Sequence, residues 1–327
     1  MRRRTPFFIC LILTIFLAVS ACGTNQTKEG MTAENKSDIP KQYKKELNCL
    51  IFDIEHIQIN VDDDFYQGYA KKIQLNPKII TRQFLGDFQE DIYVNENGII
   101  YLEKEGKNLY IDRNSIVYLS NPEIQSYIAE KFSFEKSESD TASIHSYTEF
   151  TEASLQSEKK QLERMIQKIG IPNLVLKKCY DIEKCRYWLG IQEWQKTPVF
   201  TTVLYEGMND ERMPVQILNT SKGVEKLNAS YYFEFEQKKE EIKLLSFDKI
   251  AEALENEYSM ILTDNKYNVI GAELYFWVDV NQEESEYKME PVWIFTIREY
   301  HGGKEKNGMV LQEIIHAETG KRVGVRG

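Results

Sequence analysis

Apolar residues recur at helical spacing in four parts of the chain. Asn-Pro pairs at 76–77 and 121–122 each place an N-cap residue before a proline at the first helical position, and each precedes a short apolar stripe. Longer stripes cover 152–169, which ends at Gly170, and 247–258. The pattern therefore predicts four amphipathic helices.

Short runs of alternating apolar and polar residues predict strands between these helices. In the run 268–280, Ala272, Leu274 and Phe276 fall on one face, and the intervening residues fall on the other. The remaining strand-like runs are 50–61, 91–94, 99–102, 108–111, 115–119, 174–180, 185–191, 197–205 and 290–298. Short connections with Asn-Gly and Glu-Gly turns favour antiparallel pairing, so the predicted fold class is α+β.

From about residue 151 the chain repeats one order of elements. A helix, strand-like runs and a Pro-Val-aromatic run occur in 152–200 and again in 247–293 at similar spacing. Because proline has no N–H to donate to a sheet, Pro198 and Pro291 are expected at a strand start or a sheet edge. The sequence thus predicts a small N-terminal α+β unit followed by two tandem helix-plus-antiparallel-sheet units. The predicted boundaries are 46–134 for the N-terminal domain, 135–150 for a linker, and 151–245 and 246–327 for the two units.

The start of the chain carries an export signal. Three arginines, an apolar stretch at 7–17 and small residues before Cys22 form a secretory signal peptide over 1–21. The apolar stretch is shorter than a typical membrane-spanning helix. The Val-Ser-Ala-Cys run at 19–22 resembles the lipobox of bacterial lipoproteins, which implies a diacylglyceryl group on the Cys22 thiol. Plain secretion and an uncleaved anchor are the alternatives.

This signal predicts where the protein lies. Residues 22–45 are polar and lack apolar periodicity, so we expect a flexible tether. The protein is then held by lipid on the extracytoplasmic face of a bacterial cell membrane. Cys179 and Cys185 flank a short stretch between two predicted strands, and a bridged hairpin is geometrically allowed in an oxidising compartment. Two free thiols are the equal alternative.

Composition and motifs limit the functions that the sequence predicts. The net charge of −10 has the wrong sign for a protein that binds nucleic acid. The sequence lacks the common hydrolase, nucleotide-binding and zinc-protease motifs, and its four histidines are scattered. The acidic run at 61–64 is interpreted as a solvated turn, because it lacks the pattern of a calcium loop. We therefore predict no catalytic residue, no metal site and no cofactor.

The C-terminal residues resemble a known type of domain. The helix from Phe247, the strand through Leu274, the Pro-Val-Trp run at 291–293 and the Ala-Glu-Thr-Gly turn at 317–320 are similar to a PepSY-type unit. The tandem arrangement is similar to the extracytoplasmic YycH/YycI regulators, which restrain a membrane sensor kinase. Those regulators have a transmembrane helix where this chain has a lipobox. The resemblance implies a fold and a binding or inhibitory role, with no catalytic residue.

Two tryptophans are the candidate contacts with a partner. Trp277 and Trp293 both lie on predicted strands, although an aromatic residue on a strand more often packs in a core. Trp293 shares a face with Phe295 and Ile297, which predicts burial inside the C-terminal unit. We expect a non-enzymatic lipoprotein that binds or regulates another envelope protein. A solute- or glycan-binding lipoprotein and a hydrolase with an unrecognised site are the alternatives.

Overall fold

A computed structural model describes most of the chain after the export signal. The described residues are 39–59, 65–87, 94–96, 98–131, 143–145, 153–182, 185–201, 213–260, 266–280, 284–301 and 304–323. They form a mixed α+β structure with many more strands than helices. Cys22 and the predicted signal peptide lie outside these residues.

All four predicted helices form. They are α2 (Pro77–Leu85), α3 (Ile124–Lys131), α4 (Ala153–Lys168) and α5 (Phe247–Ser259). Asn76 is the N-cap of α2, because its side chain accepts a hydrogen bond from the backbone N–H of Lys78. Ser246 has the same role for α5, accepting from Lys249 N–H. None of the described helices is long and apolar enough to cross a membrane.

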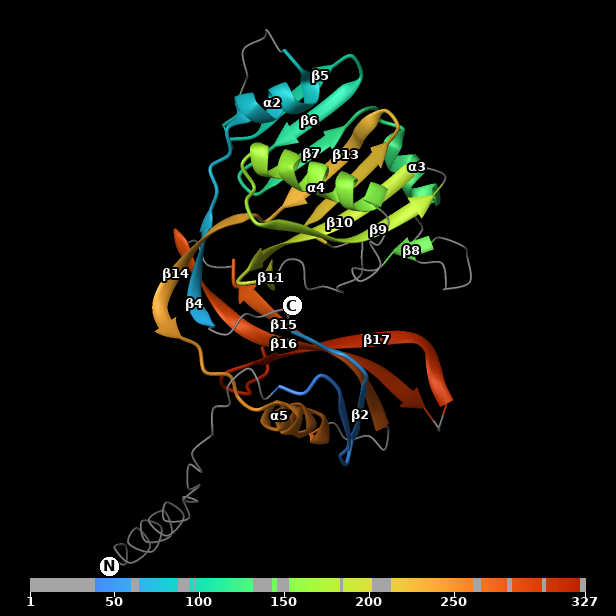
Figure 1. Ribbon diagram of the computed structural model, residues 1–327, viewed down its shortest axis with the longest axis vertical. Coiled ribbons are helices and arrows are strands. Elements are labelled where there is room, and N and C mark those ends of the chain that lie inside the picture. The colour runs from blue at the N-terminus through green and yellow to red at the C-terminus, as the bar shows by residue number, and fades with distance from the viewer. Residues whose placement is uncertain are drawn as a thin grey trace, which may run out of the picture. The chain divides into compact units, whose positions relative to one another are not determined.

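Eight of the described strands form the sheet that α4 covers, here called the α4 sheet. In spatial order they are β8 (Ser143–His145), β9 (Leu174–Ile182), β10 (Cys185–Trp194), β12 (Val215–Thr220), β13 (Gly223–Ser230), β7 (Ser115–Leu119), β6 (Lys107–Ile111) and β5 (Ile100–Lys104), all antiparallel. Figure 1 shows α4 and α2 against this sheet. Ile80 of α2 and Leu162 of α4 share one core with strand residues, so both helices cover the same face.

The other strands form the sheet that α5 covers, here called the α5 sheet. Its strands are β1 (Tyr43–Glu46), β2 (Leu50–Ile54), β3 (Ile57–Gln58), β4 (Tyr66–Lys72), β11 (Thr197–Thr201), β14 (Phe233–Glu241), β15 (Lys266–Val278), β16 (Glu286–His301) and β17 (Lys304–His316). The central strand β15 is antiparallel to β16 and parallel to β2, β3 and β11. Strand β16 also pairs with β17 and β4, and β4 pairs with β14. This sheet is therefore mixed.

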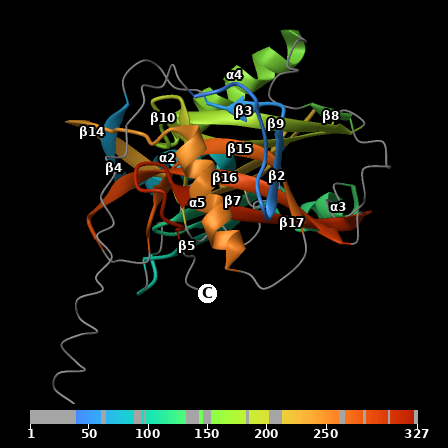
Figure 2. The ribbon, with the colours of Figure 1, turned by 90° about the horizontal axis from the view of Figure 1, so that it is seen from below.

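Helix α5 lies across the α5 sheet, as Figure 2 shows from below. The buried residues Phe247, Ile250 and Leu254 recur at helical spacing and face the sheet. Phe247 meets Trp293 edge to face, with ring centroids 5.1 Å apart. The predicted faces of the run at 268–280 are confirmed, because Ala272, Leu274 and Phe276 join this core while Tyr275 packs on the opposite face.

The predicted N-terminal domain at 46–134 is wrong as an independent unit. Strands β2 and β3 pair with β15, β4 pairs with β14 and β16, and β7 pairs with β13, so this stretch is divided between the two sheets. Likewise, β11 and β14 come from the predicted first unit at 151–245 and pair in the α5 sheet. Each α2, β5, β6 or β7 segment alone buries too little apolar surface, so the chain completes larger sheets instead.

Two segment boundaries also change. The predicted tether at 22–45 overlaps β1, whose Tyr43 lies opposite Ile54 of β2. The predicted linker at 135–150 contains β8, which pairs with β9. The sequence analysis missed both strands because their residues are mostly polar. Each strand is short and is stabilised by a neighbouring strand rather than by its own apolar residues.

Pro291 is not at the start of its strand. It is an interior residue of β16, whereas Pro198 is the second residue of β11. The Pro291 carbonyl accepts a hydrogen bond from Ala317 N–H at 2.8 Å, so the backbone of Pro291 faces the β17 side. On that side β16 passes from pairing with β4 to pairing with β17. The missing N–H therefore falls at a break between partners, where it interrupts no ladder.

Candidate functional site

The face of the α4 sheet opposite α2 and α4 carries a row of aromatic and apolar side chains. Tyr101 of β5 lies opposite Tyr110 of β6, and Tyr110 lies opposite Val117 of β7. Directly opposed residues point to the same face, so these three side chains form one row, here called the tyrosine row. Their neighbours Ile100 and Leu102 point the other way, into the core under α2.

The tyrosine row is open to solvent at its outer end. Tyr101 is 59% exposed, which is unusual for so large a side chain, and Tyr110 and Val117 are half-buried. The Tyr101 hydroxyl donates a 2.7 Å hydrogen bond to Oδ1 of Asn108 on the next strand. This bond holds the exposed ring in one orientation. Burial and a hydrogen bond to Asp112 raise the pKa of Tyr110, so its hydroxyl stays protonated at neutral pH.

Helix α3 covers the other end of the same face. Ile124 and Ile128 of α3 pack on Tyr187, Leu189 and Leu218 from β10 and β12. Figure 1 shows α3 beside β9 and β10 rather than over β5 and β6. One sheet face therefore has a covered half and an open half, and the tyrosine row lies in the open half.

A lysine is buried where the covered half begins. Lys226 of β13 lies opposite Leu119 and Leu218 and is 6% exposed. Its Nζ donates to the Tyr187 hydroxyl at 3.4 Å, and that hydroxyl donates to Oε1 of Gln216 at 2.8 Å. Burial lowers the pKa of Lys226. Among the described residues, Lys226 is the buried lysine or arginine, and no carboxylate forms an ion pair with it.

The predicted partner contacts have different surroundings. Trp293 is 1% exposed in the core under α5, so its assignment as a contact is wrong and the prediction of burial is confirmed. Trp277 is half-buried on the opposite face of the sheet, beside the cluster that contains Phe200 and Val292. Trp277 and Trp293 lie on opposite faces of the α5 sheet, so the structure does not bring them together. The contact role of Trp277 stays a prediction.

The predicted disulfide does not form. Cys179 lies opposite Trp188 and is buried in the core under α4. Cys185 packs on the α3 side and accepts a 3.1 Å hydrogen bond from the Tyr127 hydroxyl. The two thiols are on opposite faces of one hairpin and both are free, because the antiparallel register separates them.

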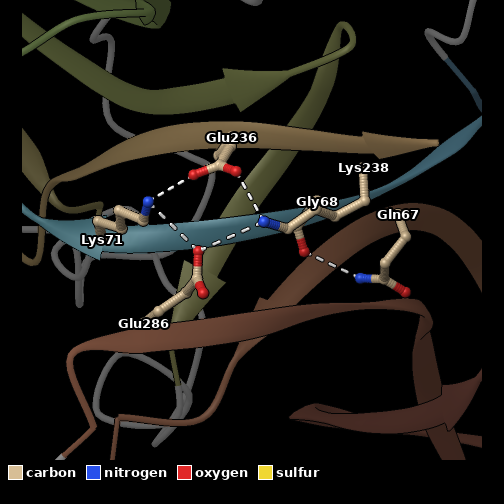
Figure 3. Close-up of polar contacts among 6 residues, drawn as sticks. All are labelled: Gln67, Gly68, Lys71, Glu236, Lys238 and Glu286. Atoms are coloured by element: carbon tan, nitrogen blue, oxygen red, sulfur yellow. Dashed lines mark hydrogen bonds and ion pairs between the residues drawn. The ribbon is translucent and has the colours of Figure 1, made fainter. Parts of the chain in front are cut away.

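A charged cluster lies where β4, β14 and β16 meet (Figure 3). Lys71 and Lys238 both pair with Glu236, and Glu286 lies 3.4 Å from Lys71 Nζ and 4.0 Å from Lys238 Nζ. Two cations and two anions alternate, so the cluster is neutral and links three strands. Hydrogen bonds from Lys238 and Lys71 lower the pKa of Glu236 to about 2.

Close packing surrounds this cluster. Gln67 Nε2 donates to the Gly68 and Met289 carbonyl oxygens, at 2.9 and 2.7 Å. Gly68 is required here, because a Cβ atom at this position would lie 2.2 Å from Met289 Cε and 2.7 Å from Trp194 Nε1. We interpret the junction as a structural clamp rather than a reactive site. The described residues contain no group of three metal-ligating side chains.

Both ring nitrogens of His316 lie near polar groups. Its Nδ1 accepts a hydrogen bond from Glu318 N–H at 3.2 Å, and its Nε2 lies 4.0 Å from Glu290. Burial lowers its pKa, although Glu290 opposes that shift.

The sequence interpretation missed the tyrosine row. The alternation of Ile100, Tyr101 and Leu102 shows that the tyrosine faces away from its neighbours. It does not show which face a helix covers, and that fact is what makes Tyr101 exposed.

Comparisons with known proteins support the fold alone. The sequence matches no family profile, and no curated protein matches it. The structure is similar to an uncharacterised protein from Eubacterium rectale ATCC 33656, with a TM-score of 0.54 and 14% identity over 89% of this chain and 95% of that one. A weaker likeness, with a TM-score of 0.29 and 10% identity, relates 75% of this chain to 92% of the Bacillus megaterium YpeB C-terminal domain. The first likeness shows that a bacterial protein shares this fold.

Proposed function

We propose that the protein is a lipid-anchored, non-enzymatic lipoprotein that binds or regulates another envelope protein through the tyrosine row. The observation that carries this proposal is the exposure of Tyr101 in the open half of a sheet face whose other half α3 covers. Tyrosine is enriched where proteins bind one another, because its ring buries a large area and has few rotamers to lose. The bond from Tyr101 to Asn108 lowers that cost further.

The surrounding chemistry favours binding over catalysis. The charged groups at the junction and around Glu158 of α4 are paired with partners inside the chain. Groups that are neutralised in this way hold elements together and are not poised for proton transfer. The resemblance to PepSY-type units and to the YycH/YycI regulators supports the same class of role. Lipid on Cys22 would place the row at the extracytoplasmic membrane face.

A photo-crosslink at the tyrosine row tests binding. Tyr101→benzoylphenylalanine in the lipidated full chain, irradiated in the cells that produce it, is expected to form one adduct with a second exported protein, which mass spectrometry of the adduct then identifies. Ile79→benzoylphenylalanine is the matched control. Ile79 is 48% exposed but belongs to α2, on the covered side of the sheet.

Two outcomes would contradict the proposal. Equal adducts from positions 79 and 101 would show unspecific contact, and an absence of adducts at 101 would remove the row as a binding surface. Release of a bound sugar or small solute from the purified protein, with no protein adduct, would instead favour the solute- or glycan-binding alternative.

Anchoring needs its own test. Cys22→Ala is expected to abolish incorporation of labelled palmitate and to leave the signal peptide uncleaved by signal peptidase II. Wild-type processing that is insensitive to globomycin, without palmitate incorporation, would contradict the predicted lipid anchor. It would leave the binding proposal standing.

A further inference from the structure

The two faces of the β5–β6 hairpin carry opposite charges. Lys104 and Lys107 lie opposite each other on the face that α2 covers. Lys104 Nζ donates to the Leu85 and Asp87 carbonyl oxygens at the end of α2, at 3.1 and 2.8 Å. These contacts direct its cation toward the helix end and away from the tyrosine row. The lysine side of the hairpin is thus occupied by the protein itself.

The open face carries a carboxylate. Glu103 follows Tyr101 by two residues on β5, so both side chains point to the open face. Asp112 lies near Tyr110, but its carboxylate already accepts hydrogen bonds from the N–H groups of Asn114 and Ser115, both at 2.6 Å, and from the Ser115 hydroxyl at 2.9 Å. Glu103 is exposed and has no hydrogen bond or ion pair to the part of the chain that the structure describes. An unpaired carboxylate therefore borders the exposed ring of Tyr101.

This arrangement suits one type of side chain. Residues two apart on a strand are separated by roughly 6 to 7 Å, which is close to the span of a guanidinium group that stacks on one and pairs with the other. A cation attracts the negative face of an aromatic ring, and arginine adds planar stacking and a bidentate pair with a carboxylate. The net charge of −10 would steer a cationic partner toward the protein and repel an anionic one.

We propose that the tyrosine row, with Glu103, binds an arginine-bearing cationic segment of the partner protein. This proposal rests on the proposed function, because it names the chemistry of the partner that the row would bind. The arginine would stack on Tyr101 and pair with Glu103. Glu103 and the net charge of −10 would repel anionic lipid surfaces and nucleic acids.

Binding of short peptides to the purified full chain in detergent tests the charge preference. The probes are fluorescent nonapeptides that alternate alanine with arginine, lysine or glutamate, measured by anisotropy. The arginine peptide is expected to bind more tightly than the lysine peptide, and the glutamate peptide not to bind. Tyr101→Ala should weaken the arginine peptide about threefold, as an exposed cation–π contact predicts. Glu103→Lys should weaken it about tenfold through charge repulsion.

A matched charge reversal separates local recognition from overall attraction. Glu240 of β14 is also exposed, and Glu240→Lys makes the same change in net charge as Glu103→Lys. We expect Glu240→Lys to change the affinity less than twofold, because it alters only the net charge of the protein, whose long-range attraction is screened by salt. Equal weakening by the two reversals, or equal binding of the arginine and glutamate peptides, would overturn the proposal.

The cellular crosslink distinguishes this inference from the proposed function. If the adduct at position 101 persists unchanged in a Glu103→Lys background, the proposed function stands and the cationic partner is wrong. If no adduct forms but the arginine peptide binds with the expected dependence on Tyr101 and Glu103, the charge preference stands and binding of an envelope protein fails.

Discussion

Helices α4 and α5 each cover a sheet, and each carries one buried or nearly buried glutamate. The two glutamates bind different kinds of partner. Glu158 of α4 accepts 2.8 Å hydrogen bonds from Trp188 Nε1 and Asn219 Nδ2 and pairs with Arg186, all from its own sheet strands. Glu255 of α5 accepts from the backbone N–H groups of Cys49 and Leu50, at 2.9 and 3.0 Å.

The difference shows how each region is completed. The three partners of Glu158 lie on β10 and β12, between 28 and 61 residues further along the chain. The partners of Glu255 lie more than 200 residues away, at the start of β2. The α5 sheet therefore needs the N-terminal stretch, and β2 contributes Leu50, Phe52 and Ile54 to the core under α5. Any soluble fragment should begin no later than residue 39.

The largest expected effect is the loss of the aromatic core under α5. Trp293→Ala removes a side chain that is 1% exposed and packs on Phe247, which should destabilise the protein by about 3–5 kcal/mol. Thermal unfolding of the purified full chain, followed by circular dichroism, measures this. Trp277→Ala is the control and should cost less, because Trp277 is half-buried. An unchanged midpoint for Trp293→Ala would refute the core assignment.

The next largest effect is expected for the loss of the Glu158 carboxylate of α4. Glu158→Gln removes the ion pair with Arg186 and points an amide group at that guanidinium, so a loss of about 2–3 kcal/mol is expected. Chemical denaturation gives the total, and hydrogen exchange should rise in α4 and β10. Faster exchange in β2 instead would contradict the interpretation that Glu158 holds only its own unit.

A smaller effect is expected at α5. Glu255→Gln keeps one of the two acceptors and leaves one backbone N–H of Cys49 or Leu50 unpaired, which should cost about 1–2 kcal/mol. Hydrogen exchange should rise in residues 43–58 as well as in α5, because the bond joins them. If exchange rises in α5 alone, the glutamate does not hold the N-terminal stretch.

The smallest effect concerns the charged cluster between the three strands. The folded pKa of Glu236 is lowered to about 2 from 4.5, so its contribution is present above pH 4.5 and is lost as the pH falls toward 2. Water and salt screen this exposed group, and the change is small. Glu236→Gln should flatten the stability profile between pH 4.5 and 2. Identical profiles for wild type and variant would contradict the interpretation that the cluster stabilises the junction of the three strands.

The candidate site was only partly within reach of the sequence. Alternation predicted a strand at 99–102, and it placed Trp293 with Phe295 and Ile297 correctly. It did not identify Tyr101 as a surface residue, because an identical alternation describes a strand that is covered on both faces. Alternation also predicted the burial of Trp293, and the structure shows that α5 covers the face on which it lies.

The sequence by itself determined the presence of the four helices, the faces of the strand at 268–280 and the N-cap Asn76, since all depend on neighbours a few positions away. The helix expected from Pro122 begins only at Ile124. The sequence also carries the predicted export signal at Cys22, which the described residues do not include. Only the tertiary structure decided which strands share a sheet, that Cys179 and Cys185 face apart, and that α3 leaves the tyrosine row open. Strand pairing joins residues far apart in the chain, so periodicity within one strand contains no record of its partner.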